Sequence, residues 1–261
     1  MDKKTISRDG TELAYARAGE GPAVVLVSGA MSTGATMAPL AALLADRCTV
    51  IRYDRRGRGE SGDTAPYAVE REVEDLAALV GAAGGEACLY GISSGGALVL
   101  EAVAAGLPVR RAAVYETPFA VDEDDARSRA AYTANLTEAL AQGRRGDAVE
   151  LFLRLTGLAE EMIGSARRSP MWAGMEAVAP TLAYDDKVMG GGRVPRERLA
   201  SVAVPVLAAA GEASPPWLRE AVRAVADAVP EGTYRTLEGQ THMVDPAVLA
   251  PLLAEFFGLP G

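Results

Sequence analysis

The segment that most constrains this chain runs from Leu89 to Gly96, with the sequence Leu-Tyr-Gly-Ile-Ser-Ser-Gly-Gly. It predicts the end of a buried strand, a very sharp turn, and a helix that starts at Ser93. Such a turn brings strand and helix into near contact, and Gly91 and Gly95 remove the Cβ atoms that would collide there. The hydroxyl of Ser93 is then held at a helix N-terminus, where negative charge is favoured. The pattern predicts a nucleophilic serine.

A glycine-rich turn without chemistry is the alternative interpretation. The chain contains 28 glycines, so a lone Gly-x-Ser-x-Gly match is only moderate evidence for a nucleophile. The strand–turn–helix context around Ser93 favours the functional interpretation. Ser94 is the weaker candidate, because no glycine stands two residues before it.

Apolar runs and helical spacings alternate along most of the chain. After a hairpin formed by residues 3–8 and 11–18, we expect strands at 23–27, 48–53, 87–90, 111–115, 204–209 and 234–237, and helices at 38–46, 68–83, 93–105, 215–229 and 246–257. Strands that alternate with helices in this way form a parallel sheet with right-handed crossovers. The predicted fold class is therefore α/β, with a mostly parallel central sheet flanked by helices.

The alternation stops between residues 120 and 195, where helical patterns follow one another at 124–142, 146–157, 159–168 and 171–184. We interpret this stretch as an inserted helical cap. The chain then divides into a first core part (1–119), the cap (120–195) and a second core part (196–261). We predict that the cap covers the site with apolar side chains and that Trp172 contacts substrate, although such residues are more often plain packing.

Composition excludes several classes of partner. The formal net charge of −9 argues against nucleic acid and against an anionic membrane surface. The two cysteines, Cys48 and Cys88, lie in predicted buried strands and suggest neither a disulfide framework nor a metal site. The N-terminus leads directly into a strand without a stretch of signal-peptide length, so we expect a cytoplasmic protein.

The chain has a single histidine, His242, in the loop between the last predicted strand and the last helix. A solitary histidine is more often an ordinary surface or core residue. If Ser93 is a nucleophile, however, it needs a base that titrates near neutral pH, and His242 alone has a suitable unperturbed pKa. The two residues support each other as nucleophile and base.

Several motifs together resemble the α/β-hydrolase family. They are the early hairpin, the Ser28-Gly29 loop, the loop Tyr53-Asp54-Arg55-Arg56-Gly57-Arg58-Gly59-Glu60-Ser61, the Gly-x-Ser-x-Gly turn, the helical insertion and the late Gly-x-x-His. The resemblance covers essentially the whole chain outside the cap. We interpret the arginine-rich loop as structural, because it lacks the Lys-Ser/Thr of a phosphate-binding loop. The resemblance implies an oxyanion hole of backbone N–H groups, one from Ser94 and one from Ala30 or Gly29.

The sequence departs from the family at the triad acid. Most of these hydrolases have an aspartate beyond the strand that follows the cap, where this chain has Ser214. Glu116, at the end of the strand after the nucleophile helix, is similar in position to the glutamate of zearalenone-type lactone hydrolases and would reach Nδ1 of His242. A structural role for Glu116 is the alternative, with Glu212 and Asp245 as the other candidate acids.

The resemblance therefore implies a serine hydrolase of carboxylic esters that needs neither cofactor nor metal. A lactone or another apolar ester is the expected small-molecule partner. The sequence is also compatible with a homodimer. The competing class is a non-hydrolytic protein of the same fold, either a ligand receptor or a biosynthetic cyclase or lyase. Loss of the usual aspartate is compatible with that class.

Overall fold

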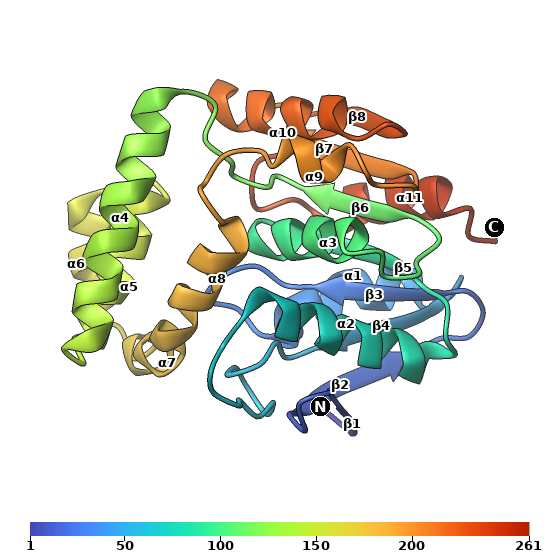
Figure 1. Ribbon diagram of the computed structural model, residues 1–261, viewed down its shortest axis with the longest axis horizontal. Helices are drawn as coiled ribbons and strands as arrows, with labels where there is room; N and C mark the ends of the chain where they lie inside the picture. Colours follow the sequence, from blue (N-terminus) through green and yellow to red (C-terminus); the bar gives the residue numbers. More distant parts are fainter. Residues whose placement is uncertain (261) are drawn as a thin grey trace.

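A twisted eight-stranded sheet forms the centre of the computed structural model, which describes residues 1–260 (Figure 1). The order is β1-β2-β4-β3-β5-β6-β7-β8, antiparallel for β1, β2 and β4 and parallel from β4 to β8. The predicted fold class is confirmed. The strands are β1 (Lys3–Ile6), β2 (Glu12–Ala18), β3 (Ala23–Val27), β4 (Thr49–Tyr53), β5 (Cys88–Ile92), β6 (Ala112–Tyr115), β7 (Val206–Gly211) and β8 (Gly232–Leu237).

Helices cover both faces of this sheet. All five residues of β3 are buried, and they alternate between two apolar clusters because successive side chains of a strand point to opposite faces. One cluster contains residues of α2 (Val69–Ala83), α3 (Ser94–Ala104) and α10 (Pro216–Ala228), and the other contains residues of α1 (Ala38–Leu44) and α11 (Pro246–Phe257). Cys48 and Cys88 are buried free thiols in the second cluster.

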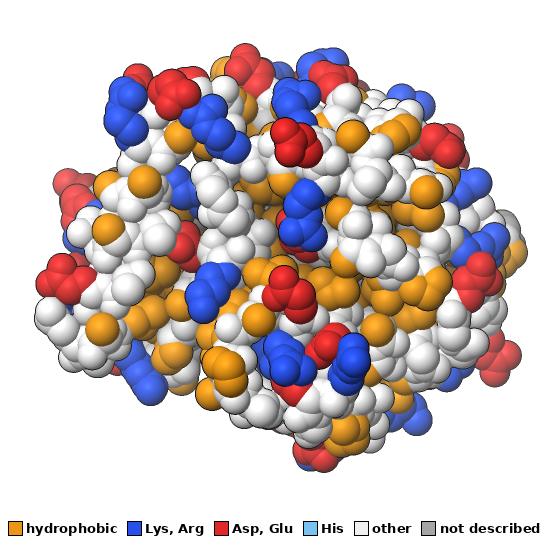
Figure 2. All heavy atoms as spheres, in the orientation of Figure 1, with side chains coloured by type: hydrophobic (Ala, Val, Ile, Leu, Met, Phe, Trp, Pro, Cys, Tyr) orange, Lys and Arg blue, Asp and Glu red, His pale blue; other side chains and the backbone are white. Residues whose placement is uncertain are grey.

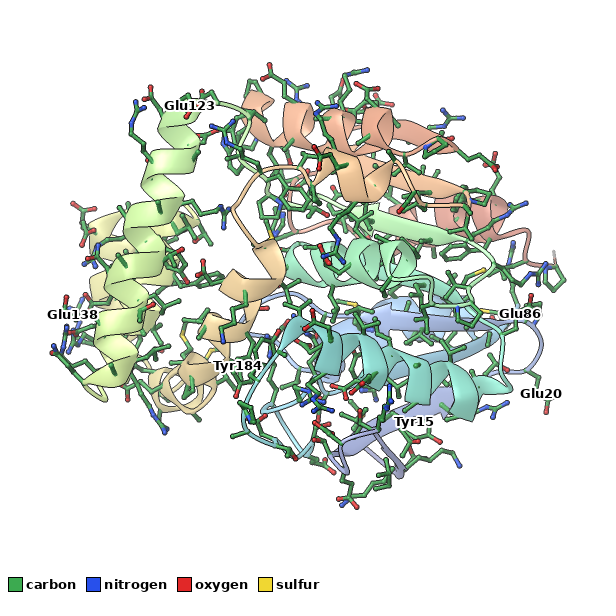
Figure 3. All side chains as sticks on the ribbon, in the orientation of Figure 1. Tyr15, Glu20, Glu86, Glu123, Glu138 and Tyr184 are labelled. Carbon is green, nitrogen blue, oxygen red and sulfur yellow. The ribbon has the colours of Figure 1, made fainter. Side chains whose placement is uncertain are left out.

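The helical segment between β6 and β7 forms a layer beside one end of the sheet (Figure 1). It contains α4 (Glu123–Ala141), α5 (Arg145–Leu155), α6 (Glu160–Arg167), α7 (Trp172–Val178) and α8 (Leu182–Met189), followed by the short α9 (Arg196–Leu199). Labels on Glu123 and Glu138 mark the two ends of α4 in Figure 3. The chain leaves and re-enters the α/β part at one place, where the Ala120 N–H donates to the Gly192 carbonyl at 2.7 Å.

One predicted helix of this segment is wrong in its extent. The stretch 171–184 is divided into α7, a 3₁₀ turn at Ala179–Thr181 and the beginning of α8. Pro180 lies in that turn, and proline has no N–H for a helical hydrogen bond. The division lets α8 take its own direction, between the other helices and the sheet (Figure 1).

The surface carries charges of both signs. On the face in Figure 2, acidic and basic side chains lie interspersed among apolar ones. Among residues 1–260, no helix combines the length and the apolar character that a bilayer crossing requires.

Candidate active site

The predicted turn between β5 and α3 is present, with Ser93 as its single connecting residue. Ser93 has φ 56° and ψ −127°, outside the common regions for a residue with a side chain. A Cβ on Gly91 would collide with the Gly95 carbonyl, and a Cβ on Gly95 would lie 2.5 Å from the Ser28 carbonyl oxygen. The two glycines therefore permit the close approach of helix, strand and neighbouring loop on which the position of Ser93 depends.

Backbone strain is concentrated at this edge of the sheet. Within residues 1–260, the non-glycine residues with positive φ are Met31, Ser93 and Glu116, which follow β3, β5 and β6 respectively. Because the carboxyl ends of parallel strands share one edge, these three residues lie on the same side of the sheet. Strained residues of this kind persist where the surrounding structure holds them, commonly at active sites.

His242 is hydrogen-bonded to Glu116. The Nδ1 atom of His242 lies 2.9 Å from Oε2 of Glu116, and Oε1 of Glu116 accepts a hydrogen bond from the Gly211 N–H at 2.8 Å. The Glu116 side chain is fully buried, whereas that of His242 is 43% exposed. The carboxylate is therefore held at both oxygens, and the remaining ring nitrogen, Nε2, stays available to another partner.

The end of β6 joins the segments of this site. The Tyr115 carbonyl accepts a hydrogen bond from the Ser93 N–H at 2.9 Å, and the Tyr115 hydroxyl donates to the Thr241 carbonyl at 2.7 Å. Ser93 Oγ forms no direct hydrogen bond with His242 among the described residues. Hydrogen bonds between nucleophile and base are often long without substrate and tighten in the complex.

The other candidate acids are occupied elsewhere. The Glu212 carboxylate is exposed and accepts a hydrogen bond from the Gly239 N–H at 3.2 Å. Asp245 caps α11, with its side chain accepting from the Ala247 N–H at 2.8 Å. Ser214 is buried, and its hydroxyl has no hydrogen-bond partner within the described part of the chain.

The predicted oxyanion segment lies directly beside Ser93. A Cβ on Gly29 would stand 3.1 Å from the Ser93 Cβ. Neither the Ala30 N–H nor the Ser94 N–H forms a hydrogen bond within residues 1–260. Two free backbone donors therefore belong to the residue after the nucleophile and to the loop next to it.

Trp172 lies inside the helical segment. Its side chain is 8% exposed and packs in a cluster with Leu136 and Val149, while the Arg167 guanidinium stands 5.9 Å above its ring. This is the packing arrangement that the sequence analysis gave as the alternative. Substrate contact by Trp172 stays a prediction.

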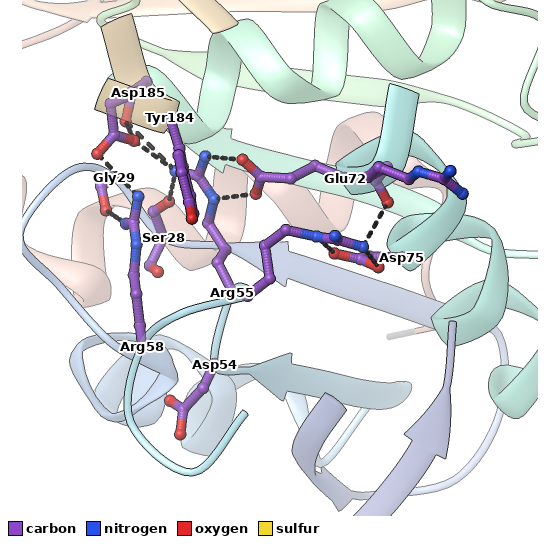
Figure 4. Close-up of polar contacts among 12 residues, drawn as sticks. Ser28, Gly29, Asp54, Arg55, Arg58, Glu72, Asp75, Tyr184 and Asp185 are labelled. Atoms are coloured by element: carbon purple, nitrogen blue, oxygen red, sulfur yellow. Dashed lines mark hydrogen bonds and ion pairs between the residues drawn. The ribbon is translucent and has the colours of Figure 1, made fainter. Parts of the chain in front are cut away.

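The arginine-rich loop after β4 carries buried ion pairs. Arg55, Arg56 and Arg58 are all buried. Figure 4 shows Arg55 and Arg58 among the carboxylates of Glu72 and Asp185, and Arg56 pairs with Asp75 at 2.7 and 2.8 Å. Arg55 forms two hydrogen bonds with Glu72, at 2.7 and 2.8 Å, and one with Asp185 of α8 at 2.8 Å. Three arginines in four positions after a buried strand could have signalled buried ion pairs, but nothing in the sequence identified Asp185.

These buried charges balance one another. Burial alone would raise the pKa of Asp185, but the positive charges of Arg58 and Arg55 outweigh it and hold that pKa below its usual value. Burial would likewise lower the pKa of Arg55, and the charges of Glu72 and Asp185 instead raise it well above its usual value. Asp185 and Arg55 therefore stay ionised at neutral pH.

No metal centre is evident around these residues. Within residues 1–260, no group of three or more His, Cys, Asp or Glu side chains is arranged to hold a metal ion. Two surface cavities, of about 260 and 450 Å³, lie along α4 and α5 and beside Arg193, and neither includes Ser93 or His242. The geometry above, rather than cavity size, locates the site.

Comparisons with known proteins agree with the observed fold. Residues 24–252 match the model of the alpha/beta hydrolase family. An alpha/beta hydrolase from Sphaerobacter thermophilus, known from its crystal structure, has 51% sequence identity to this chain. The alignment covers 98% of this chain and 100% of that chain, with a TM-score of 0.87. A thermophilic esterase from Thermogutta terrifontis is 21% identical (98% and 97% covered, TM-score 0.74). Est816, described as an N-acyl homoserine lactone degrading enzyme, is 21% identical (97% and 99% covered, TM-score 0.68). The latter two share the fold, whereas the family match and the 51% identical relative show that this chain belongs to the alpha/beta hydrolase family.

Proposed function

We propose that this protein is a serine hydrolase of carboxylic esters, with Ser93 as nucleophile, His242 as base and Glu116 as the acid that orients it. The observation that supports this most is the hydrogen bond between His242 Nδ1 and Glu116 Oε2 at 2.9 Å, formed beside the strained Ser93 turn. A nucleophile at such a turn, a histidine and a buried carboxylate on that histidine are the parts that acyl transfer requires.

The chemistry follows from the position of each proton. With Nδ1–H donated to Glu116, Nε2 of His242 is the acceptor that takes the Ser93 proton as Oγ attacks the ester carbonyl. The buried carboxylate stabilises the imidazolium that results. The N–H groups of Ser94 and Ala30 receive the developing oxyanion. His242 then protonates the leaving alcohol, and water, activated by the same base, releases the acid from the acyl-enzyme.

Apolar esters, and lactones among them, are the substrate class that we propose. The apolar cluster of the helical segment packs against Ala30 and Met31, so apolar side chains of the cap reach the loop beside Ser93. Pockets lined in this way favour apolar acyl groups. Est816, which shares this fold, is described as an N-acyl homoserine lactone degrading enzyme. The position of Glu116 directly after β6 is the local resemblance to zearalenone-type lactone hydrolases.

Labelling with a fluorophosphonate tests this function directly. We expect rapid, stoichiometric phosphonylation of Ser93, because the probe reacts with serines activated by a general base. Peptide mapping by mass spectrometry identifies the labelled residue, and the Ser93→Ala protein is the unlabelled control. If the wild-type protein is not labelled and binds an apolar ligand tightly without turnover, it is a ligand receptor and not a hydrolase. Conversion of such a ligand without hydrolysis would indicate a cyclase or lyase.

Removal of most of the helical segment should alter selectivity. Replacing residues 123–178 with a short Gly-Ser linker removes α4 to α7 and retains α8, which contacts the core. The preference for a long-chain over an acetyl p-nitrophenyl ester, measured as the ratio of kcat/KM values, should fall by at least about tenfold, since each lost apolar contact weakens discrimination.

Fluorophosphonate labelling of Ser93 in the shortened protein is the control for an intact site. If labelling persists and the long-chain preference is unchanged, the segment does not select substrates.

A further inference from the structure

We propose that Asp185, on α8 of the helical segment, is a positioning residue that aligns both donors of the oxyanion hole. The inference rests on the proposed function. It means that a residue of the helical segment, outside the α/β core, stabilises the geometry of the oxyanion hole. Asp185 is buried and accepts hydrogen bonds at both carboxylate oxygens. One set of contacts leads to Ser94 and the other to the loop that contains Ala30.

The first contact fixes the residue after the nucleophile. The Ser94 hydroxyl donates to Oδ1 of Asp185 at 2.8 Å, and Ser94 is only 4% exposed. Because the hydroxyl is held by a charged acceptor, the bond is stronger than one between neutral groups. The first residue of α3, whose backbone N–H is a proposed donor, is thereby tied to α8.

The second contact runs through Arg58. Its Nη2 donates to Oδ2 of Asp185 at 2.7 Å, and its Nη1 donates to the Gly29 carbonyl at 2.7 Å (Figure 4). The Gly29–Ala30 peptide is trans, so its carbonyl and its N–H point in opposite directions. Because the Gly29 carbonyl is hydrogen-bonded to Arg58, the Ala30 N–H points away from the arginine. Ser32 Oγ donates to the same carbonyl at 2.6 Å and adds to this orientation.

The surrounding network makes Asp185 rigid. Arg55 donates to Oδ1 of Asp185 at 2.8 Å while its other nitrogens are held by Glu72. The preceding residue of α8, Tyr184, stacks on Tyr67 with ring centroids 3.8 Å apart, and its label in Figure 3 marks where α8 meets the core. The planar guanidinium groups impose a fixed geometry on the carboxylate. Asp185 thus holds two segments, at Gly29 and at Ser94, in one arrangement.

Asp185→Asn tests the assignment. We expect kcat to fall by about 10²-fold with KM within about twofold of wild type, because an oxyanion donor acts in the transition state rather than in substrate binding. The inhibition constant of a trifluoromethyl ketone, which forms an oxyanion on attack by Ser93, should rise in parallel with the loss in kcat/KM. The inhibition constant of the carboxylate product should stay the same.

Asp75→Asn is the matched control. Asp75 is also buried and pairs with Arg56 of the same loop at 2.7 and 2.8 Å, but within residues 1–260 it forms no hydrogen bond with Ser94 or with the segment from Ser28 to Met31. Both substitutions leave a buried arginine short of a carboxylate, so both should lower the Tm. A merely structural role for Asp185 predicts equal effects of the two variants on kcat, and that result would overturn the assignment.

Arg58→Lys keeps the test decisive if Asp185→Asn does not fold. Lysine retains the charge, but its single nitrogen cannot occupy both positions of the guanidinium fork. We expect a near-wild-type Tm with kcat reduced by about tenfold, less than for Asp185→Asn because Ser32 still holds the Gly29 carbonyl. Unchanged kcat in a folded Arg58→Lys protein contradicts the inference. Failure of wild-type Ser93 to react with a fluorophosphonate contradicts the proposed function instead.

Discussion

Ser93→Ala is expected to lower kcat for a short p-nitrophenyl ester by about 10⁶-fold, the loss seen when an activated serine nucleophile is removed. The substitution deletes Oγ and nothing else. Alanine keeps the Cβ, the positive φ and the backbone N–H that donates to the Tyr115 carbonyl, so the turn should retain its geometry. Initial-rate kinetics measure the effect, and an unchanged thermal unfolding curve verifies that the fold is intact.

Ser94→Ala is the comparison for this prediction. Residue 94 keeps its backbone N–H in that variant and loses the hydroxyl, which donates to Asp185 at 2.8 Å and accepts from Arg55 at 3.5 Å. We expect a loss of no more than about tenfold, because the donor is loosened but still present. Near-wild-type turnover by Ser93→Ala, with a large loss in Ser94→Ala, would show that the nucleophile has been misassigned.

Glu116→Gln should lower kcat by about 10⁴-fold, or about 5 kcal/mol of transition-state stabilisation, as in serine triads whose acid is replaced by its amide. Glutamine can still accept the Gly211 N–H through Oε1. Its NH₂ then faces His242 Nδ1 and donates to it, which favours the tautomer with the proton on Nε2. That tautomer cannot accept the Ser93 proton, and the charge opposite the imidazolium is lost as well.

Three further variants make this prediction specific to Glu116. Glu212→Gln and Asp245→Asn should each cost little, because Glu212 is exposed and asparagine can replace Asp245 as a helix cap. Ser214→Asp should rescue Glu116→Gln partially at best, since the His242 ring is held facing residue 116. A Glu116→Gln enzyme within about tenfold of wild type, or 1.4 kcal/mol, has not lost its triad acid. Circular dichroism on each variant excludes unfolding.

The sequence by itself determined the features that depend on local backbone geometry and on periodicity. The positions of most strands and helices followed from alternation and helical spacing, which reflect burial along each element. The turn at Ser93 could be predicted because the contacts of Gly91 and Gly95 lie within a few residues or at the adjacent strand end. The prediction of one continuous helix over 171–184 was wrong because Pro180 interrupts the helical hydrogen bonds within that stretch.

Only the tertiary structure decided which side chains meet. Glu116, Glu212 and Asp245 were all reasonable partners for His242 in the sequence, and the order of β6, β7 and β8 in the sheet brings Glu116 to it across 126 positions. Asp185 reaches Ser94 across 91 positions through the docking of α8. Local patterns record which face of an element is buried, whereas such polar pairs depend on how separate elements pack, and no single segment of the chain carries that information.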